Sequence, residues 1–398
     1  MNRLVSSLIF VFLFTGCATE EGWTPSPNEP RAFVTTLGAD TTQVEVYTRT
    51  ASVIEGIYVN RIPSTFVIEY NARLDENQHI VRLEANRWTP KTNPTGATSS
   101  RAVIEIADGV ASIIREGGQN PGTSEVILEN EAIPTLGFTA ASAFIFEQVA
   151  EKLQAGSKSI FLLNASGANA RENDARVVAG DTVSMDYFGQ RRKAWTDRSG
   201  QLLGISGAGT TNSSTSRRVE PFLVGSHADR WAALDVSGTG LGVPSPSATT
   251  QATVQGSDME IRYSQPAKRG RDIWGGLVPE GVIWRTGANA ATHFSTSQPL
   301  TIGGNALEAG TYTLWSMYQD GALHFIVNSQ TDQWGTAHDP AYDLFTVVTV
   351  QSDRDQAAER FSISMESTDE GGAIHFDWDM TRFSVPFTVN STTRVSKV

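Results

Sequence analysis

The residues that could carry out chemistry are scattered along this chain of 398 residues rather than gathered in one motif. The sequence contains no GxSxG nucleophile elbow, no SxxK pair, no HExxH zinc helix and no phosphate-binding GxxxxGK loop. A serine becomes a nucleophile only beside a positioned base, and no spacing here pairs a serine with one. The sequence therefore names no catalytic residue, and we expect no cofactor.

Histidines and carboxylates leave two weak candidates for a metal or acid–base site. No two of the six histidines have the spacing of a chelating pair, so we expect no metal centre. His338, Asp339 and Asp343 frame a loop that could hold a cation, although capping of the turn by aspartate is favoured. Asp377 and Asp379 share one face of a predicted strand, as the carboxylates of a glycosidase would. A solvated strand face is the favoured interpretation of that pair.

An arginine among tryptophans is the best candidate for a ligand site. The candidates for a ligand-facing cluster are Trp284, Arg285, Asn289 and Trp334. A guanidinium beside aromatic rings can stack on them, and it can bind a carboxylate or hydroxyl groups with two parallel hydrogen bonds. The alternative, which we favour, is that a buried carboxylate holds Arg285 while the tryptophan fills the core.

The N-terminus has the features of an export signal. Arg3 precedes an apolar run, Leu4–Phe14, that is about half as long as a membrane-spanning helix needs to be. We therefore predict that residues 1–16 are a signal peptide. The run ends at Thr15 and Gly16, just before Cys17, the only cysteine of the chain.

Phe14–Cys17 resembles the lipobox of bacterial lipoproteins, in which the cysteine is acylated and becomes the new N-terminus. The chain departs from that pattern, because Phe14 stands where the family prefers leucine. The alternative is ordinary cleavage after Ala18. We expect Cys17 to be lipidated and residues 17–31 to form a tether to the membrane. Because no Asp follows the cysteine, the resemblance implies an outer-membrane lipoprotein, facing the periplasm or the exterior.

The charge balance excludes one class of partner. The chain has 31 Lys and Arg against 43 Asp and Glu, which gives a formal net charge of −12. An acidic chain without basic clusters repels phosphate backbones, so we expect no nucleic-acid partner.

Alternating polar and apolar residues predict a mainly β first domain over residues 32–235, as a curved antiparallel sheet of half-barrel type with one helix. The helix is predicted over Ala140–Gln154, because Phe146, Val149 and Leu153 form one apolar stripe. This architecture resembles the half-barrel of LolA-like lipoprotein carriers. The predicted strands are Gln43–Arg49, Thr65–Leu74, Ile80–Trp88, Arg101–Ile106, Val110–Arg115, Ser159–Leu163, Thr182–Tyr187, Arg191–Thr196 and Gln201–Ser206.

The sheet of the first domain could hold an apolar ligand. Phe66, Ile68 and Tyr70 share one face of a predicted strand, and a single helix of about 22 Å would cover only part of a broad sheet. The uncovered part would be a concave pocket for a small molecule or lipid. The alternative, which we favour, is that loops such as Thr89–Ser100 seal the core.

A linker rich in Gly, Pro and Ser separates the second domain from the first. We place this linker at residues 236–250, the second domain at 251–389 and a short tail at 390–398. Short runs of Val, Ile, Phe and Thr, bounded by glycine turns, predict a β-sandwich or jelly roll. Two of the predicted strands are His324–Asn328 and Leu344–Val350.

The second domain resembles the bacterial family called domain of unknown function 2911. The resemblance rests on Tyr263–Pro266, Gly270–Pro279, Val282–Asn289, Ala309–Leu314, Asn328, Gln333–Gly335 and Trp378–Phe387. It implies an exported β-sandwich and no established activity. The family commonly has Glu after Gly-Ala-Asn, where this chain has Ala290, so a chemical role of that carboxylate would be lost here.

These observations favour a lipid-anchored envelope protein without enzymatic activity. We expect the membrane as its partner through Cys17, together with a small-molecule or lipid ligand or a partner protein. The alternatives are a hydrolase of envelope glycans, which would use carboxylates of the second domain, and a structural scaffold with two sealed cores.

Overall fold

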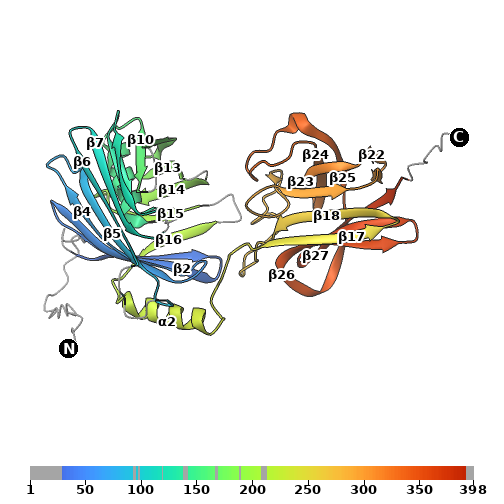
Figure 1. The fold of residues 1–398 in the computed structure, drawn as a ribbon, viewed down its shortest axis with the longest axis horizontal. Helices are drawn as coiled ribbons and strands as arrows, with labels where there is room; N and C mark the ends of the chain where they lie inside the picture. Colours follow the sequence, from blue (N-terminus) through green and yellow to red (C-terminus); the bar gives the residue numbers. More distant parts are fainter. Residues whose placement is uncertain are drawn as a thin grey trace.

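The computed structural model describes residues 29–92, 96, 99–118, 120–137, 142–165, 169–187, 190–207 and 213–390. The predicted signal peptide, Cys17, most of the tether and residues 391–398 of the predicted tail lie outside these residues. The protein is mainly β and consists of two β-rich parts that lie side by side along its long axis (Figure 1). No helix in the described part of the chain is long and apolar enough to cross a membrane.

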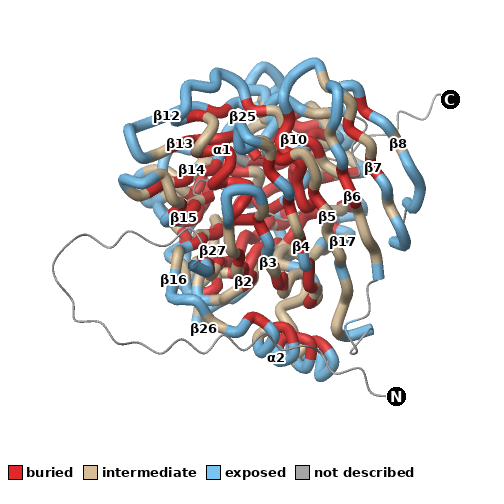
Figure 2. The backbone as a smooth tube through the Cα atoms, turned by 90° about the vertical axis from the view of Figure 1, so that its left-hand side faces the viewer, coloured by how far each residue is buried: buried red, intermediate tan, exposed pale blue. Residues whose placement is uncertain are grey.

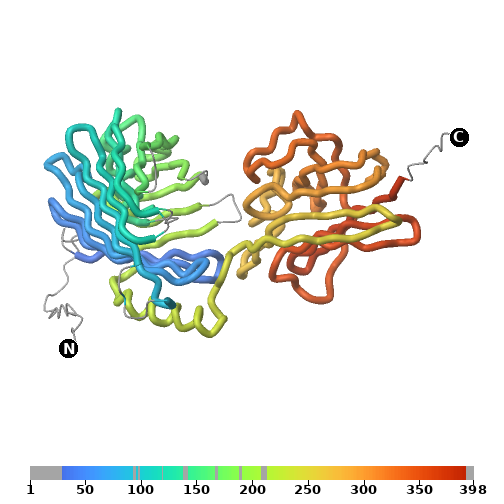
Figure 3. The backbone as a smooth tube through the Cα atoms, viewed as in Figure 1, coloured from blue at the N-terminus to red at the C-terminus, as the bar shows by residue number. Residues whose placement is uncertain are grey.

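The N-terminal part is built on one 13-stranded antiparallel sheet, which curves around a buried interior (Figure 3). Its order is β12-β13-β14-β15-β16-β1-β2-β3-β4-β5-β6-β7-β8, and its two outermost strands do not pair with each other, so the sheet is not a closed barrel. The strands are β1 (Arg31–Leu37), β2 (Asp40–Arg49), β3 (Val53–Asn60), β4 (Phe66–Leu74), β5 (Ile80–Trp88), β6 (Ser100–Ala107), β7 (Val110–Gly117), β8 (Gly122–Ile127), β12 (Ala175–Ala179), β13 (Thr182–Tyr187), β14 (Gln190–Thr196), β15 (Leu202–Ser206) and β16 (Ser214–Val219).

Helix α1 (Ala143–Gln154) fills the interior of this sheet. Most of α1 is buried (Figure 2). Its apolar side chains, among them Phe144, Phe146 and Val149, pack in one core with residues of the strands. A small sheet of β9 (Ala132–Thr135), β10 (Ile160–Asn164) and β11 (Arg171–Asn173) lies next to α1 in the sequence, and β9 and β10 contact the helix. The predicted curved antiparallel sheet with an enclosed helix is thereby confirmed.

A second helix, α2 (Gly225–Val236), was not expected from the sequence, which predicted one helix. Trp231 and Ala228 of α2 are buried against Val44, Val59 and Val67 of β2, β3 and β4. These valines alternate with residues that face α1, so α2 covers the outer face of the sheet. The sheet therefore has a helix on each of its faces.

The C-terminal part contains two sheets whose inner faces share one core. This is the β-sandwich expected from the sequence. The seven-stranded sheet has the order β17 (Ser247–Val254), β18 (Ser257–Ser264), β20 (Thr292–Thr296), β23 (Gly310–Gln319), β24 (Ala322–Asn328) and β25 (Asp343–Val348), and β19 (Ile283–Trp284) also pairs with β23. The four-stranded sheet has the order β22 (Asn305–Leu307), β21 (Leu300–Ile302), β27 (Gly371–Val389) and β26 (Val350–Thr368), and a short 3-10 helix, η1 (Pro340–Tyr342), precedes β25.

Strand β27 doubles back on itself. The side chains of His375 and Ser384 are hydrogen-bonded at 2.8 Å, although nine residues of straight strand would separate them by about 30 Å. Asp377 and Arg382 also meet, with two hydrogen bonds of 2.7 Å. The chain therefore reverses between these pairs, at Asp379, whose φ of 55° is typical of a tight turn.

The two parts are joined by residues 237–246, between the end of α2 and the start of β17. Strand β17 begins at Ser247, so regular pairing starts within the stretch that the sequence assigns to the linker. The parts also touch elsewhere: the Ala39 N–H donates to the Arg269 carbonyl oxygen at 2.8 Å, and the Arg269 guanidinium pairs with Asp40. Gly38 precedes this contact, and a side chain there would overlap with the Arg269 backbone.

Candidate functional site

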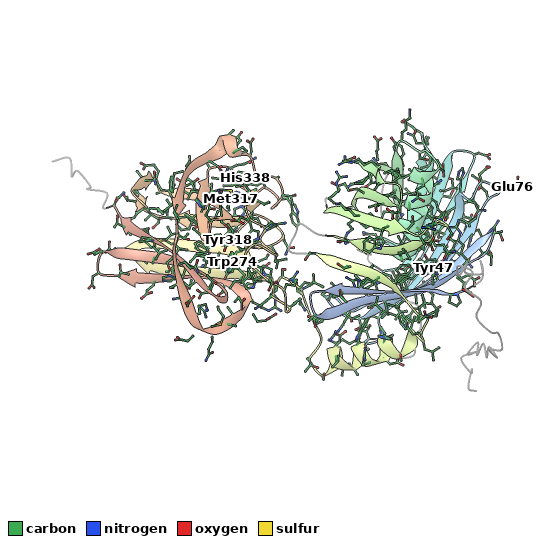
Figure 4. All side chains as sticks on the ribbon, turned by 180° about the vertical axis from the view of Figure 1, so that it is seen from behind. Tyr47, Glu76, Trp274, Met317, Tyr318 and His338 are labelled. Atoms are coloured by element: carbon green, nitrogen blue, oxygen red, sulfur yellow. The ribbon has the colours of Figure 1, made fainter. Side chains whose placement is uncertain are left out.

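Trp284, one of the four residues predicted to face a ligand, lies in the core of the sandwich. It is 6% exposed, stacks on Trp378 with ring centroids 5.8 Å apart, and donates its indole N–H to the Gly287 carbonyl at 2.9 Å. Trp274 packs edge to face on Trp284. The ring centroids of Trp274 and Tyr318 are 5.6 Å apart (Figure 4). The structure thus assigns Trp284 to packing, and the predicted cluster reduces to the three remaining residues.

Arg285 lies against the backbone of two neighbouring segments. Its Nη1 donates to the Asn289 carbonyl oxygen at 3.0 Å, and a side chain on Gly335 would overlap with the Arg285 side chain. Burial lowers the pKa of Arg285, and no charged group contributes to that shift. Among the described residues no carboxylate pairs with Arg285, so the buried carboxylate expected by the alternative is absent there.

Asn289 and Trp334 flank Arg285 on adjacent segments. Asn289, with a φ of 62°, donates its side-chain amide to the Ser264 hydroxyl at 3.3 Å, which fixes the turn that carries the acceptor of Arg285. Trp334 is 58% exposed and forms an isolated bridge with Ala290. Trp334 and Gly335 begin a turn, in which the Trp334 carbonyl oxygen accepts from the Ala337 N–H at 2.9 Å. Arg285 and Asn289 form one surface. The exposed indole of Trp334 belongs to the segment that borders this surface at Gly335.

The residues proposed to line a pocket in the first domain are mostly core residues. Ile68 and Tyr70 are buried with α1, and the Tyr70 ring stacks on Phe144 with centroids 4.6 Å apart. Phe66 is only partly buried, and the Arg87 guanidinium lies over its ring, 4.2 Å from the centroid. The packing of Ile68 and Tyr70 against α1 supports the sealed core at this position.

Two glutamates hold α1 inside the sheet. Glu45 of β2 accepts hydrogen bonds from the Tyr70 hydroxyl and the Ser142 hydroxyl, each at 2.8 Å, and from the Ala143 N–H at the start of α1. Burial raises the pKa of Glu45 to about 7, against the lowering effect of these donors. Glu147 of α1 pairs with Arg31 and accepts from the Tyr47 hydroxyl at 2.9 Å.

The carboxylates considered for glycoside hydrolysis are bound to cations. Asp377 is buried and pairs with both Arg382 and Arg354, and hydrogen bonds and charge from these arginines hold its pKa below the ordinary range, against the effect of burial. Asp379 pairs with Lys268 at 2.6 Å. A general acid needs a raised pKa, so Asp377 is unsuited to that role.

The acidic loop at His338 is held by internal hydrogen bonds. Asp339 caps η1 by accepting from the Ala341 N–H at 3.0 Å, and Asp343 accepts from the Asn328 side chain at 2.8 Å and lies 2.9 Å from a nitrogen of the His338 ring. Within the described part of the chain no three His, Cys, Asp or Glu residues are placed to hold a metal ion. Turn capping by Asp339, the favoured interpretation, agrees with this geometry.

The motifs quoted from the sequence lie in the sandwich. This part also contains the turn at Arg285 and the packed rings of Trp274, Trp284 and Trp378. Residues 245–387 match the model of DUF2911, a protein family of unknown function. The match confirms the resemblance found in the sequence. It runs from just before β17 to near the end of β27, and this matched region is the DUF2911 domain.

Two other comparisons add little about function. A β-barrel-like protein of domain of unknown function DUF1849 from Brucella abortus is 14% identical, with a TM-score of 0.34, and the alignment covers 48% of this chain and 95% of that protein. No curated protein matches the chain.

The DUF2911 domain also contains a constellation that sequence reasoning missed. His375 lies between Ser384, 2.8 Å from its Nδ1, and Glu366, whose carboxylate is 3.1 Å from its Nε2. No local pattern in the sequence indicates this arrangement, because Glu366, His375 and Ser384 follow one another at intervals of nine residues. They meet only through the β26–β27 pairing and the reversal of β27. The expectation that no serine is paired with a base is therefore wrong for Ser384.

Proposed function

We propose that the protein is a lipid-anchored component of the bacterial envelope that binds a small anionic ligand at Arg285 of its DUF2911 domain. The observation that carries the proposal is the uncompensated charge of this arginine. A guanidinium has five N–H donors, and the hydrogen bond to Asn289 uses one of them. Arg285 is only partly buried, and a ligand carboxylate or phosphate can accept from the guanidinium N–H groups that make no hydrogen bond to a described residue.

The surroundings of Arg285 support recognition of a flat or elongated anion. Gly335 lets the backbone approach the arginine stem, which limits the positions that the side chain can take. A pre-ordered guanidinium loses less conformational entropy when it binds than a free one does. The exposed Trp334 borders the same segment and offers an apolar surface next to the anion site.

Ligand binding is tested by titration of the mature protein with acetate, benzoate and inorganic phosphate at low ionic strength, with calorimetry as the readout. We expect saturable binding of at least one of these anions by the parent and none by Arg285→Gln. The matched control is Arg262→Gln, which removes an exposed arginine already paired with Glu260 and should bind as the parent does. Equal binding by Arg285→Gln and the parent would refute the site.

The membrane anchor is tested separately through Cys17, because acylation requires the thiol. We expect the parent to fractionate with membranes and Cys17→Ser to stay uncleaved or become soluble. An Ala18→Ser variant keeps the thiol and serves as the control. If Cys17→Ser has the mature length and still fractionates with membranes, the lipoprotein proposal is wrong. The proposed anion site does not depend on this result.

A further inference from the structure

The outer face of the β26–β27 sheet carries a serine, a histidine and a glutamate in hydrogen-bond contact. His375 and Ser384 alternate with inward residues of β27, since Phe376, Phe383 and Val385 are all buried in the sandwich core. Glu366 projects from the neighbouring strand, where Ser364 is the register partner of His375. The reversal of β27 brings the serine beside the histidine, and the β26–β27 pairing brings the glutamate to its other side.

The hydrogen bonds fix the roles of the two ring nitrogens. A carboxylate can only accept, so Glu366, 3.1 Å away, places the proton of the neutral imidazole on Nε2. The lone pair is then on Nδ1, and Ser384, 2.8 Å away, donates its hydroxyl hydrogen to it. This is the order of a nucleophile, a base and a carboxylate that orients the base, with the two ring nitrogens exchanged relative to the common arrangement.

A positive charge lies on the same face. Arg382 precedes Ser384 by two residues and is held rigidly by two hydrogen bonds of 2.7 Å from Nε and Nη2 to Asp377. Among the described residues no hydrogen bond engages its Nη1, although the Glu366 carboxylate lies near enough to raise the pKa of Arg382 by its charge. Such a fixed donor can stabilise negative charge that develops on an oxygen next to Ser384.

We propose that Ser384, His375 and Glu366 form a second functional site, which hydrolyses short acyl esters. Ser384 Oγ attacks the ester carbonyl carbon while its proton passes to His375 Nδ1 and the carbonyl electron pair moves to oxygen. When the intermediate collapses, the C–O bond to the alcohol breaks, and the alcohol leaves with the proton from His375. Water then attacks the acyl-Ser384 ester by the same route, which releases the carboxylic acid and restores the serine.

The position of the site favours a small acyl group on a larger carrier. Glu366 has a side chain that is 64% exposed, and Val350, the register partner of Ser384, is exposed as well. Ser384 is partly buried and His375 is buried, so the site opens to solvent beside Glu366 and Val350. An ester that enters from this side can belong to a long molecule that lies across the strands, such as an O-acetylated sugar chain. This site is separate from Arg285, and the proposal does not depend on the binding of an anion there.

The experiment uses the mature full-length protein with p-nitrophenyl acetate as substrate and a fluorophosphonate as covalent probe. We expect hydrolysis above the buffer rate, and mass spectrometry should locate the probe on Ser384. Ser384→Ala should fall to the buffer rate, and His375→Gln should lose on the order of 100-fold or more. Glu366→Gln, which acts through the histidine, should lower kcat and leave KM unchanged.

The matched control is Ser364→Ala, because Ser364 stands beside His375 on the same face without a hydrogen bond to it. This variant should keep the parent rate and the label. Labelling of the parent does not depend on whether any variant folds. Absence of both hydrolysis and label in the folded parent overturns the proposal, and so does a Ser384→Ala variant that melts like the parent and keeps the parent rate.

Discussion

At the scale of single residues, the most telling groups are charges that the fold removes from water. Glu45 accepts three hydrogen bonds around the start of α1 and still has a pKa of about 7, because burial outweighs the donors. Glu147 resembles it in burial but faces two arginines, Arg31 and Arg49. The two carboxylates hold the same helix by different means, one through neutral donors and the other through ion pairs.

Glu45 should make the stability of the protein depend on pH between about 4.5 and 7. The folded state raises the pKa from 4.5 to about 7, so it keeps a proton that the unfolded chain releases, and stability falls as the pH rises through this window. The full effect corresponds to about 3 kcal/mol. We expect Glu45→Gln to lose this dependence, since the amide does not titrate.

Urea denaturation of the parent and of Glu45→Gln at pH 5 and pH 8 measures the effect. From pH 5 to pH 8 the free energy of unfolding of the parent should fall by about 2.5 kcal/mol relative to that of the variant. Glu55→Gln, on the exposed part of β3, is the control. A difference between Glu45→Gln and the parent that stays constant with pH would contradict the role assigned to this carboxyl.

The sequence could predict a residue's type of environment better than its partners. The expectation that tryptophan fills the core held for Trp284, because a large apolar ring in a short strand is rarely left exposed. The partners of Arg285 and Ser384 could not be predicted. Arg285 depends on the close approach of Gly335, and Ser384 on the reversal of β27, and neither leaves a local periodic signal.

At the scale of elements, alternation of polar and apolar residues located several strands of the first domain, among them β2, β4, β5, β6 and β7, but it missed β1, β3, β17, β18 and the 19-residue β26. The predicted strand Thr182–Tyr187 coincides with β13, and the predicted helix Ala140–Gln154 ends where α1 does. Helix α2 was missed because its buried apolar residues, Ala228, Trp231 and Ala232, are few and two of them are small. Its contact with the sheet relies on one large ring, which leaves a weak helical pattern.

Trp231 should therefore provide most of the docking energy of α2. Its ring is buried against the valines of β2, β3 and β4, so Trp231→Ala should destabilise the N-terminal part by about 3–5 kcal/mol. Denaturant unfolding, followed by circular dichroism, measures this change. Leu223→Ala is the control, because Leu223 is 85% exposed just before the helix. A loss of less than about 1 kcal/mol for Trp231→Ala would show that α2 is held by other contacts.

At the scale of the whole molecule, the two parts are joined by one connecting segment and a small polar contact. Among the described residues the contact includes the Ala39–Arg269 hydrogen bond, the Asp40–Arg269 ion pair and a hydrogen bond of 3.2 Å from Arg271 to Ser213. Each part has its own large core, so each should survive separation.

Limited proteolysis should separate the two parts within residues 237–246. This segment has no helix or strand in the structure, and most of its residues are exposed or half-buried. We expect two stable fragments, and their masses and N-termini identify the cut. Resistance of this segment, with cleavage instead inside Leu277–Asn289, would overturn the division into two domains.

The position of β1 in the large sheet has a consequence for the order of events during synthesis. Strand β1 pairs on one side with β2, a few residues later, and on the other with β16, where Val34 is the register partner of Arg217. While the chain emerges N-terminus first, the hairpins from β1 to β8 can form, but the second edge of β1 stays open until β16 has been made. That open edge exposes unpaired backbone N–H and C=O groups, which can pair with strands of other chains. We infer that a holding chaperone, or slow release of the nascent chain, would protect this protein most during the interval between β2 and β16.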